Sequence, residues 1–499
     1  MKAWSLLGTC FVMALAASVA TAKPEKKRKP ASVERPPQFV LLAFDGSLNL
    51  DFWGESVAFA DTVRTTGVNG QPTTVKFTYF INPPYYIEPK YAGVYKTPGL
   101  NKAVSCIGWS KPEGSAAARM RATNNAFRKG HEIGSHANSH CDASGTDRSN
   151  PLYGKRWQQN EWQSEFDQFN KMIFGAFAIN RIPAEPILFK QSDIVGFRAP
   201  LLAFTEGLWP TLKKNNFRYD TSQQSPPTYW PQRDSRWGGW NFPLGRIKIA
   251  GTNRTTLSMD YNWLVYHSAG QTKPGLTEGE RERFRLQMLE SYKYYFKQNY
   301  FGGRAPVHIG HHFSKWNHGA YWDAMKDFTK FVCGLKEVRC VTYKDYADWL
   351  DNLPAAKYQA FRSGQFDRMR PDASTPQIRD ISTPVLAEIR LDSGNNAYEA
   401  IVGSADIARV EAQQWQPQLQ INFKPHSQTS ITREELLRDQ PQGATVFLRA
   451  SLVNRQGVEV NWETYRIDNL GTPEEFMSLE PIENGSNKPE TIEAHTIEE

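Results

Sequence analysis

Short apolar runs alternate with amphipathic stretches over residues 39–353. Apolar runs typical of buried strands occupy residues 39–44, 75–81, 132–135, 194–198, 217–220, 246–249, 306–311 and 338–341. Apolar residues recur at helical spacing in residues 51–66, 115–129, 157–179, 205–215, 276–300, 319–332 and 343–350. Because the two kinds of segment follow one another in turn, the pattern predicts an α/β domain. Its parallel sheet is either open or closed into a barrel.

The pattern changes after residue 352. Alternating apolar and polar positions predict strands at residues 385–391, 398–402, 418–423, 445–454 and 458–467. We therefore expect a small all-β sandwich at residues 354–470, after the α/β domain at residues 39–353. Inside the α/β domain, residues 82–114 and 221–244 form two long loops rich in Pro, Gly, Tyr and Trp. Loops of this length are usually functional.

The two ends of the chain have the composition of export and linker segments. Residues 1–22 combine a basic start, an apolar run at 4–20 and small residues at the expected cleavage point, which is typical of a secretory signal peptide. An uncleaved anchor is the alternative. Residues 23–38, with six basic and two acidic residues, predict a flexible basic leader. Residues 471–499, with eight glutamates and one lysine, predict a disordered acidic tail, and the whole pattern predicts a secreted or periplasmic protein.

Composition narrows the class of protein. Of the 499 residues, 40% are hydrophobic and 13% aromatic, which is enough to form packed cores and excludes wholesale disorder. Apart from residues 4–20 the sequence has no long apolar run, so a multispan membrane protein is excluded and no stable membrane span is expected. A net charge of +7 without any nucleic-acid motif gives little support to nucleic-acid binding.

Four cysteines remain once the signal peptide is removed, and an even number in an exported chain is typical of disulfides. Cys333 and Cys340 are seven residues apart across an expected helix-to-strand turn, so they form one expected pair. Cys106 and Cys141 then form the second. Free buried thiols, or a role for Cys141 in the neighbouring site, are the alternatives.

Charged and imidazole side chains stand at or just after several expected strand ends, where an α/β barrel has its active site. Asp45 ends the first apolar run, and an acid there is costly to bury unless it is paired. His136 and His140 are four residues apart. On one helical turn, two neutral imidazoles at this spacing can hold one zinc or other late transition-metal ion. Taken singly, Asp45 is better explained as a loop-capping Asp, and a chance pair explains the two histidines about as well as a metal site does.

Three further strand ends extend the set. Arg198-Ala199-Pro200 places a fixed cation where it can orient a carboxylate. Asp220 is a second acid at a strand end, and His311 is a candidate general acid. Ordinary surface or packed side chains are the alternative interpretation of each.

In this order the five features resemble the polysaccharide deacetylase family, the NodB-homology fold of carbohydrate esterase family 4. That family has Thr-Phe-Asp-Asp, His-Ser/Thr-x-x-His, Arg-x-Pro, an acid at a strand end, and Leu-x-His. This chain has Phe44-Asp45, His136-x-x-x-His140, Arg198-x-Pro200, Asp220 and Ile309-x-His311. The resemblance covers residues 39–353 and implies a distorted (β/α) barrel. The long insertions look more like those of chitin deacetylases than those of the short bacterial enzymes.

The resemblance implies a division of roles. Asp45 is the general base that activates water at a divalent metal ion, and His136 and His140 hold that ion. Arg198 tethers Asp45. A backbone N–H near Leu201, directly after Pro200, stabilises the oxyanion.

For the leaving group and the substrate, the resemblance makes His311 the acid that protonates the departing amine. An acid such as Asp220 orients His311, and Ile309 lines a small acetyl pocket. Flat aromatic rings suit the C–H faces of sugars, and core packing is the alternative use of such rings. The ring candidates are Tyr229, Trp230, Trp237 and Trp240.

This chain departs from the family pattern at several positions. Gly46 stands where the family has a second Asp that ligates the metal, so one ligand is missing. Either water takes the place of the missing ligand, or the metal ion binds weakly or not at all, or another side chain serves as the ligand. The candidate substitutes are Asn49, Asp51, Asn138 and Asp142. Ala137 and Leu201 replace a hydroxyl residue and a tyrosine of the family. The adjacent His312 leaves the identity of the acid open, although the spacing from Ile309 favours His311.

Three functions follow from these features. The first is an exported metal-dependent N-deacetylase of a polymer containing N-acetylglucosamine, with peptidoglycan as the first substrate, chitin as the second and an acetylated plant polysaccharide as the third. The second is a carbohydrate-binding pseudoenzyme, which the loss at Gly46 supports. The third is a structural or adhesive wall protein that uses the sandwich. Retention of Asp45, Arg198 and His311 favours the enzyme, because glycan binding alone does not require them.

Overall fold

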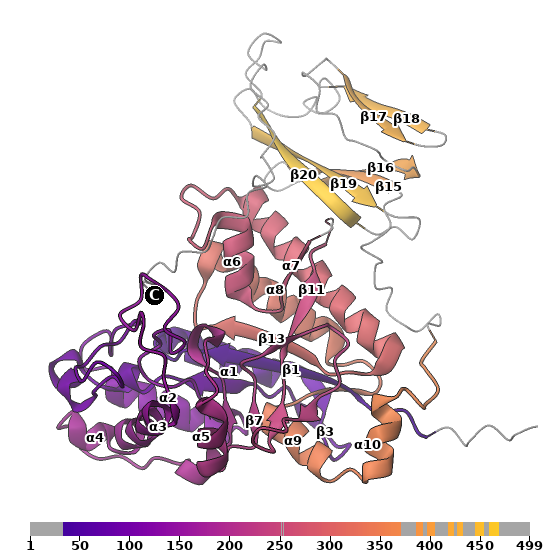
Figure 1. Ribbon diagram of the computed structural model, residues 1–499. Helices are drawn as coiled ribbons and strands as arrows, with labels where there is room; N and C mark the ends of the chain where they lie inside the picture. Colours follow the sequence, from indigo (N-terminus) through magenta and orange to yellow (C-terminus); the bar gives the residue numbers. More distant parts are fainter. Residues whose placement is uncertain are drawn as a thin grey trace, which may run out of the picture.

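The computed structural model describes residues 33–370 except 251 and 253, together with the backbone of six strands between Leu386 and Asp468 (Figure 1). The expected signal peptide, most of the leader and the acidic tail lie outside the described residues. The order of strands and helices in the described part confirms the predicted α/β class.

A curled and mainly parallel sheet forms the centre of the α/β domain (Figure 1). Its strands are β1 (Gln38–Asp45), β4 (Thr78–Ile81), β5 (Glu132–Ser135), β6 (Gly196–Phe197), β7 (Tyr219–Asp220), β9 (Gln232–Arg233), β10 (Trp240–Asn241), β13 (Val307–His312) and β14 (Val338–Cys340). They run in the order β13-β1-β4-β5-β6-β7-β10-β9, and β14 pairs with the first residues of β1. Every pair is parallel except β10 with β9. This is the distorted barrel that the sequence predicts.

Helices connect the parallel strands, as parallel pairing requires. They are α1 (Leu50–Thr62), α2 (Ala116–Arg128), α3 (Gln159–Phe174), α4 (Ala176–Ile179), α5 (Leu208–Lys214), α6 (Asp260–Ser268), α7 (Glu278–Gln298), α8 (Trp316–Val332), α9 (Tyr343–Asp351) and α10 (Ala355–Arg362). Side-chain caps fix several of the starts: Asn49 accepts from Phe52 N at α1, and capping boxes form at α7 and α9. The sequence pattern predicts neither α6 nor α10.

Side chains of β1 alternate between two cores, and every residue of the strand is buried. Leu42 and Phe44 pack in the core that the sheet shares with its outer helices, whereas Leu41 and Ala43 pack in the core inside the barrel. Residues paired in register on neighbouring strands point to the same face of a sheet. The register of β1 therefore shows which face each residue of β13 presents.

A small second sheet lies along the far edge of β13. It contains β8 (Gln224–Ser225), β11 (Leu244–Lys248) and β12 (Thr255–Leu257) in the order β12-β11-β8. Directly after β12, Met259 forms a parallel bridge with Gly310 of β13, and Gly310 N–H donates to Ser258 O at 2.9 Å. The start of α6 is thereby placed against the end of β13.

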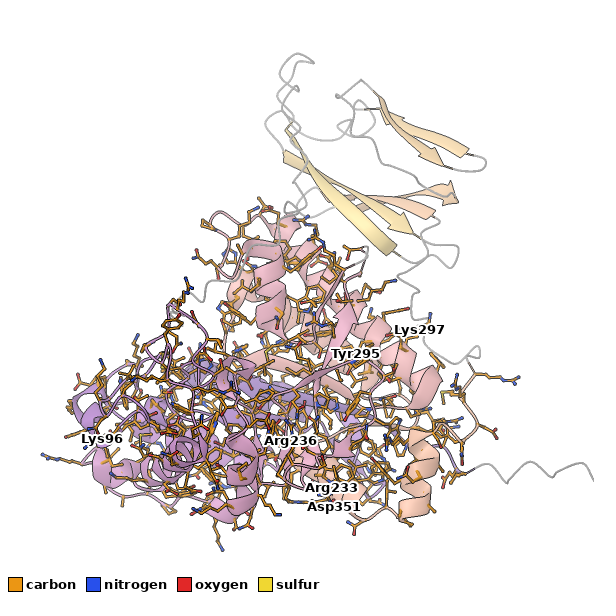
Figure 2. All side chains as sticks on the ribbon, viewed as in Figure 1. Lys96, Arg233, Arg236, Tyr295, Lys297 and Asp351 are labelled. Carbon is orange, nitrogen blue, oxygen red and sulfur yellow. A yellow bond between two sulfur atoms is a disulfide. The ribbon has the colours of Figure 1, made fainter. Side chains whose placement is uncertain are left out.

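Both long loops of the domain carry short structure of their own. The first contains the 3-10 helices Pro83–Tyr86 and Pro89–Val94, and the second contains β8, β9 and β10. The second loop is tied to α9 through Asp351, which accepts hydrogen bonds from Trp240 Nε1 at 2.7 Å and from Arg233. Arg233 and Asp351 are labelled in Figure 2. Arg218, just before the loop, donates to the same carboxylate at 2.6 Å. This loop is therefore a fixed part of the domain.

The core of the barrel continues beyond residue 353, where the sequence places the end of the α/β domain. Phe361 on α10 and Phe366 after it are buried in the core inside the barrel, and Val33 forms a bridge with Phe366. Both pairs of cysteines form the predicted disulfides, Cys106–Cys141 and Cys333–Cys340.

Strands alone make up the described part of the chain after residue 370. They are β15 (Leu386–Asp392), β16 (Ala397–Ser404), β17 (Gln418–Phe423), β18 (Ser427–Thr432), β19 (Thr445–Val453) and β20 (Glu459–Asp468). Antiparallel pairing gives one sheet in the order β16-β15-β19-β20 and a hairpin of β17 with β18. The sequence predicts these strands except β18. No described helix of the chain has both the length and the apolar character needed to cross a bilayer.

A carboxylic acid is buried on β5, and it makes the stability of the domain depend on pH. Glu132 accepts hydrogen bonds from Tyr219 Oη, Thr78 Oγ1 and Lys344 N at 2.8 Å each, and burial raises its pKa from 4.5 to about 7. A raised pKa in the folded state stabilises the fold below the unfolded pKa, and this contribution is lost as pH rises through the folded pKa. We expect the free energy of unfolding to fall by about 3 kcal/mol as the pH rises from 4.5, the ordinary pKa, to about 7, the pKa in the folded protein.

The measurement is urea unfolding at pH 5 and pH 8 for the wild type, Glu132→Gln and Glu113→Gln. The wild type and Glu113→Gln, which changes an exposed side chain, should lose stability between the two pH values. Glu132→Gln should lose less. Equal losses in all three proteins would contradict the assignment of the pH dependence to Glu132.

Candidate active site

Several of the predicted functional residues come together at the carboxyl ends of the parallel strands β13, β1, β5 and β6. Asp45 ends β1, His136 follows β5 and Arg198 follows β6. His311 and His312 end β13, which pairs with β1. This edge of the sheet is where an α/β barrel presents its catalytic groups.

A buried ion pair links Asp45 to Arg198. Arg198 Nη1 donates to Asp45 Oδ1 at 2.7 Å, and both side chains are nearly inaccessible to solvent. Arg198 Nη2 also donates to Thr221 Oγ1 at 3.2 Å, and the guanidinium lies over the ring of Phe80. Held in this way, Arg198 fixes the orientation of the carboxylate. The other oxygen, Asp45 Oδ2, faces His136 Nε2 at 4.0 Å.

The tautomer of His136 follows from its hydrogen bond. His136 Nδ1 lies 2.8 Å from the carbonyl oxygen of Arg198, which can only accept, so Nδ1 carries the proton. Nε2, the nitrogen nearer to Asp45, therefore has the free lone pair. Burial lowers the pKa of His136 to about 3, so the ring is neutral at neutral pH. A neutral imidazole whose other nitrogen donates to a carbonyl is the usual state of a metal-binding histidine.

His140 lies beside His136, but not on a helical turn. The two rings are nearly perpendicular, with centroids 5.0 Å apart. The segment between them is a loop in which Ala137 and His140 have positive φ angles of 54° and 53°, so the expected helical turn is wrong. Glu165 of α3 shapes the loop because its carboxylate accepts from Asn138 N at 2.7 Å and from Ser139 N at 3.1 Å.

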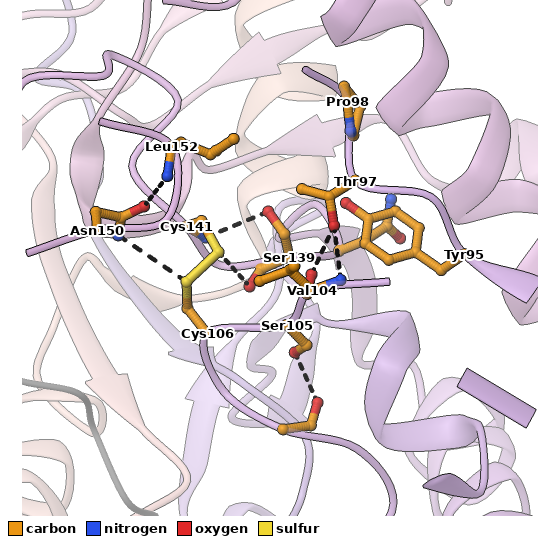
Figure 3. Close-up of a disulfide and its surroundings, with 12 residues drawn as sticks. Tyr95, Thr97, Pro98, Val104, Ser105, Cys106, Ser139, Cys141, Asn150 and Leu152 are labelled. Atoms are coloured by element: carbon orange, nitrogen blue, oxygen red, sulfur yellow. Dashed lines mark hydrogen bonds between the residues drawn. A yellow bond between two sulfur atoms is a disulfide. The ribbon is translucent and has the colours of Figure 1, made fainter. Parts of the chain in front are cut away.

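A disulfide holds the far end of this histidine loop. Cys141, which follows His140, is bonded to Cys106 in the first long loop (Figure 3). Cys106 N–H also donates to Ser139 O at 2.7 Å. The first long loop therefore positions His140 through a covalent bond and a backbone hydrogen bond.

If His140 holds a metal ion as the sequence predicts, the double variant Cys106→Ser/Cys141→Ser should lose affinity for zinc by about tenfold or more, because the disulfide that orients this histidine is removed. It should also lose about 4 kcal/mol of stability, given that the disulfide spans 35 residues. The matched control is Cys333→Ser/Cys340→Ser, which should lose stability while keeping its zinc affinity. Calorimetric zinc titration and urea unfolding give the two quantities. Equal zinc affinities in the two double variants would show that the Cys106–Cys141 bond has no role in positioning His140.

Gly46 leaves the two imidazoles without the carboxylate that the family resemblance would supply. Its φ is +88°, in the region that favours glycine, and no cluster of three or more His, Cys, Asp or Glu side chains in the described part of the chain is arranged to hold a metal ion. Asn49 caps α1, and Asp142 accepts from three backbone N–H groups of its own loop. Asp51 is exposed. Asn138 differs from them, since its Oδ1 is buried and has no hydrogen-bond partner.

The two histidines of β13 point to opposite faces of the sheet. His312 pairs in register with Asp45, whereas His311 pairs with Phe44. His311 accordingly lies among the outer helices, with its ring centroid 6.1 Å from that of Phe44 and Nε2 3.4 Å from Tyr292 Oη. The sequence spacing favours His311, but the structure places His312 on the face that carries Asp45.

Asp260, at the start of α6, holds the end of β13. It lies 2.7 Å from His312 Nδ1, accepts from His312 N at 2.8 Å and lies 3.5 Å from His311 Nδ1. Burial alone would raise the pKa of Asp260, but the adjacent His312 and His311 hold it below its ordinary value. The sequence pattern predicts no element here and misses Asp260. The only signal before it is the short alternating stretch at residues 255–259, which is weaker than the continuous apolar run that precedes Asp45.

Asp220 has a different place from the one expected. Its carboxylate accepts from Ser222 Oγ at 2.6 Å and from Ser222 N at 3.0 Å, and Ser222 Oγ in turn accepts from Ala199 N at 2.8 Å. The acid that lies against His311 and His312 is Asp260, so the structure does not give Asp220 the expected orienting role. The contacts of Asp220 support the turn that follows Arg198.

That turn presents an unpaired backbone donor. Leu201 and Leu202 both have positive φ angles, 55° and 53°, in a strained conformation of the kind found at functional sites. Leu202 N–H donates to Ala199 O, whereas Leu201 N–H has no acceptor among the described residues. The side chain of Leu201 is 44% exposed. Leu201 N–H therefore lies in the turn where the family resemblance places an oxyanion donor, and that role stays a prediction.

The tryptophans expected to stack on sugar belong instead to the core. Trp230, Trp237 and Trp240 are each at least nine-tenths buried, and Trp230 Nε1 donates to Gly303 O. Tyr229 is half-buried. Ile309 faces the outer helices and is fully buried in their core, so it does not line the face that carries Asp45.

Two other aromatic rings border His312. Trp316, at the start of α8, has its ring centroid 5.1 Å from that of His312, and Tyr261 has its centroid 6.1 Å away. The two rings also contact each other and are only partly buried. The sequence pattern gives no reason to choose these two rings among many.

No protein-family model matches the sequence, and no curated protein matches it. Three similar solved structures are those of a Mycobacterium smegmatis protein assigned as a polysaccharide deacetylase, the family 4 carbohydrate esterase from Streptomyces lividans and the chitin deacetylase of Colletotrichum lindemuthianum. Their sequence identities are 12%, 10% and 12%, and their TM-scores are 0.37, 0.28 and 0.31. The matches cover 69%, 60% and 62% of this chain and 98%, 90% and 90% of those chains. Similarity at this level transfers no activity, so the function below is argued from the side chains of the site.

Proposed function

We propose that this protein is an exported hydrolase that removes N-acetyl groups from the N-acetylglucosamine units of a polysaccharide. Peptidoglycan is the first choice of substrate and chitin is the second. The observation that supports the proposal is the buried Asp45 carboxylate, held by Arg198 and paired in register with His312. A fixed base beside an imidazole serves proton transfer to and from a substrate, whereas glycan binding alone requires neither group.

In the proposed reaction, Asp45 accepts a proton from water while the water oxygen attacks the carbonyl carbon of the acetamide. Leu201 N–H donates to the carbonyl oxygen as negative charge develops on it. His312, whose Nδ1 is held by Asp260, protonates the nitrogen as the C–N bond breaks. The products are acetate and a sugar with a free amine.

His136 and His140 would hold a divalent metal ion, with zinc as the first choice. Two neutral imidazoles fit zinc, and the open third position falls to Asn138 Oδ1 or to water, because Gly46 has no donor. Such an ion, when bound, polarises the acetyl carbonyl and makes water more acidic.

The sugar platform of the proposed site is the partly buried pair Trp316 and Tyr261. We expect Trp316→Ala to raise KM for chitin oligomers by about tenfold, which corresponds to about 1.4 kcal/mol, with a smaller change in kcat. Trp316→Phe keeps a flat ring and should retain most of the affinity. Steady-state kinetics of both variants test this, and an unchanged KM in Trp316→Ala would show that the sugar binds elsewhere.

The metal part of the proposal is tested on the purified mature chain and His136→Ala. Zinc content and acetate release from peptidoglycan and chitin oligomers are measured before chelation, after chelation and after zinc is restored. We expect acetate release to follow zinc in the wild type and to be absent throughout in His136→Ala. Full acetate release from the zinc-free wild type would contradict the metal requirement while leaving the deacetylase assignment in place.

Gly46 favours a second function, namely glycan binding without turnover. At a φ of +88°, the backbone there disfavours the aspartate that a third metal ligand would need. Under this alternative the protein binds the polymers and releases no acetate in any metal condition.

The export part of the proposal is supported by the two disulfides, which form and persist in oxidising compartments. Together with residues 1–22, they favour a secreted or periplasmic location, where a cell-wall glycan is within reach.

A further inference from the structure

The inner face of β13 has a gap where a side chain would normally stand beside the catalytic carboxylate. His312 and Gly310 lie two residues apart on the same face, and Gly310 pairs with Ala43 inside the barrel. Ile309 is on the other face. The wall of the site next to Asp45 therefore has to come from another element.

Met259 fills this gap. A Cβ atom built on Gly310 would lie 2.7 Å from Met259 Cε and 3.6 Å from Met259 Cγ, so the thioether chain lies directly over the glycine. The same Cβ position is 3.3 Å from Arg198 Nη1, the atom that donates to Asp45. Met259 Cε and the ion pair thus border the same small volume. The parallel bridge between Met259 and Gly310 fixes this arrangement.

An apolar cluster continues from Met259 toward the turn that carries the free N–H group. Met259 is buried with Leu244 and Leu257, and Leu202 packs against them. Leu202 is the neighbour of Leu201, whose N–H is the proposed oxyanion donor. Asp260, which holds His312, directly follows Met259 in the chain.

The three substituents of the acetamide carbon then have separate surroundings. Its oxygen is directed to Leu201 N–H and its nitrogen to His312, so its methyl group is directed to the remaining apolar wall. Met259 Cε is the member of that wall that lies against Gly310, whose Cβ position is 3.3 Å from Arg198 Nη1 of the ion pair. A flexible, unbranched thioether is a side chain that fills such an irregular gap closely.

We propose that Met259 forms the floor of the acyl pocket and limits the substrate to a short acyl group, namely acetyl. The inference rests on the proposed function and adds the residue that sets acyl-chain selectivity. Gly310 has a part in it, because any larger residue there would displace Met259.

The experiment compares kcat/KM for N-acetyl, N-propionyl and N-butyryl chitooligosaccharides in the zinc-loaded wild type, Met259→Ala, Met259→Leu and Met120→Ala. Met120 is an equally buried methionine on α2, in the core shared with the outer helices. The ratio of kcat/KM for two substrates, measured on one sample, does not depend on the fraction of protein that is folded. Partial misfolding of a variant therefore leaves the result interpretable.

We expect the wild type to prefer acetyl. In Met259→Ala the butyryl-to-acetyl ratio should rise by about tenfold or more, since each methylene group in a close-fitting pocket changes the rate by about that factor. Met259→Leu and Met120→Ala should keep the wild-type ratio. An unchanged ratio in Met259→Ala, with acetyl still hydrolysed, overturns the inference and leaves the proposed function intact. Failure of the wild type to hydrolyse any of the three substrates overturns both.

Discussion

Asp45→Asn is expected to lower kcat for acetate release by about 10³-fold, within the range that a general base contributes. Asn keeps the size of the side chain and an oxygen that can accept from Arg198, but it cannot take a proton from water. The loss should therefore appear in kcat and much less in KM. Initial rates of acetate release, with zinc content measured on the same samples, give both quantities.

Asp220→Asn is the matched control for Asp45→Asn. Asp220 is also a buried acid at the end of a parallel strand, but it contacts Ser222 rather than the reacting groups. We expect kcat of Asp220→Asn to fall by less than about tenfold, because Asp220 only supports the turn that carries Leu201 N–H. Similar losses in both variants would show that Asp45 has no special role as the base.

His312→Gln is expected to lower kcat by about 10²- to 10³-fold on amide substrates, as the loss of a general acid does. His311→Gln should lose much less, because His311 faces the outer helices and Tyr292. The two variants change neighbouring residues of one type that contact the same carboxylate, so each serves as the control for the other.

The nature of the leaving group separates an acid from a residue that only maintains the structure. An aryl acetate ester releases a stable phenolate that needs no proton, so its hydrolysis should be nearly insensitive to His312→Gln. A loss of the same size on ester and amide would contradict the role of His312 as the acid. A larger amide-selective loss in His311→Gln would return the role to His311.

The alternation of apolar runs and helical patterns was sufficient to predict the parallel sheet. β1 reads as a strand because both faces of it are buried, and its eight residues are apolar except at the ends. α7 could be predicted from the apolar residues that recur at helical spacing in residues 276–300, and in the structure its start carries the capping box formed by Thr277 and Glu280. α6 could not be predicted from the sequence, because its nine residues show no clear helical spacing of apolar positions. Its place is instead set by tertiary contacts with β13 and α8.

The sequence predicts those site residues that are charged and stand at strand ends. It does not predict which of two neighbouring residues points to the face of the sheet that carries the site. Asp45 and Arg198 come together because parallel strands end at one edge, which the order of the motifs already indicates. His311 and His312 could be distinguished only by the register of β13 with β1, which depends on tertiary packing. Asp260 reaches the site through a single bridge beside β13, and the sequence shows no sign of that bridge.

The helical turn expected for His136 and His140 is wrong for a similar reason. The spacing of four residues suits a helix, but the loop instead follows hydrogen bonds to Glu165 and the disulfide of Cys141. These partners lie far away in the sequence. Burial, which the sequence does not reveal residue by residue, also decides that Trp230 and Trp237 pack in the core.

The most direct test of the central claim is the count of acetate and new amine groups released by one purified sample. The zinc-loaded mature chain and its Asp45→Asn variant are incubated with peptidoglycan and with chitin oligomers, and binding of both glycans is measured in parallel. We predict acetate and amine in equal amounts from the wild type on at least one polymer, and about 10³-fold slower release of both from Asp45→Asn, although the variant still binds the glycan. Glycan binding by the wild type without acetate release from either polymer would contradict the account.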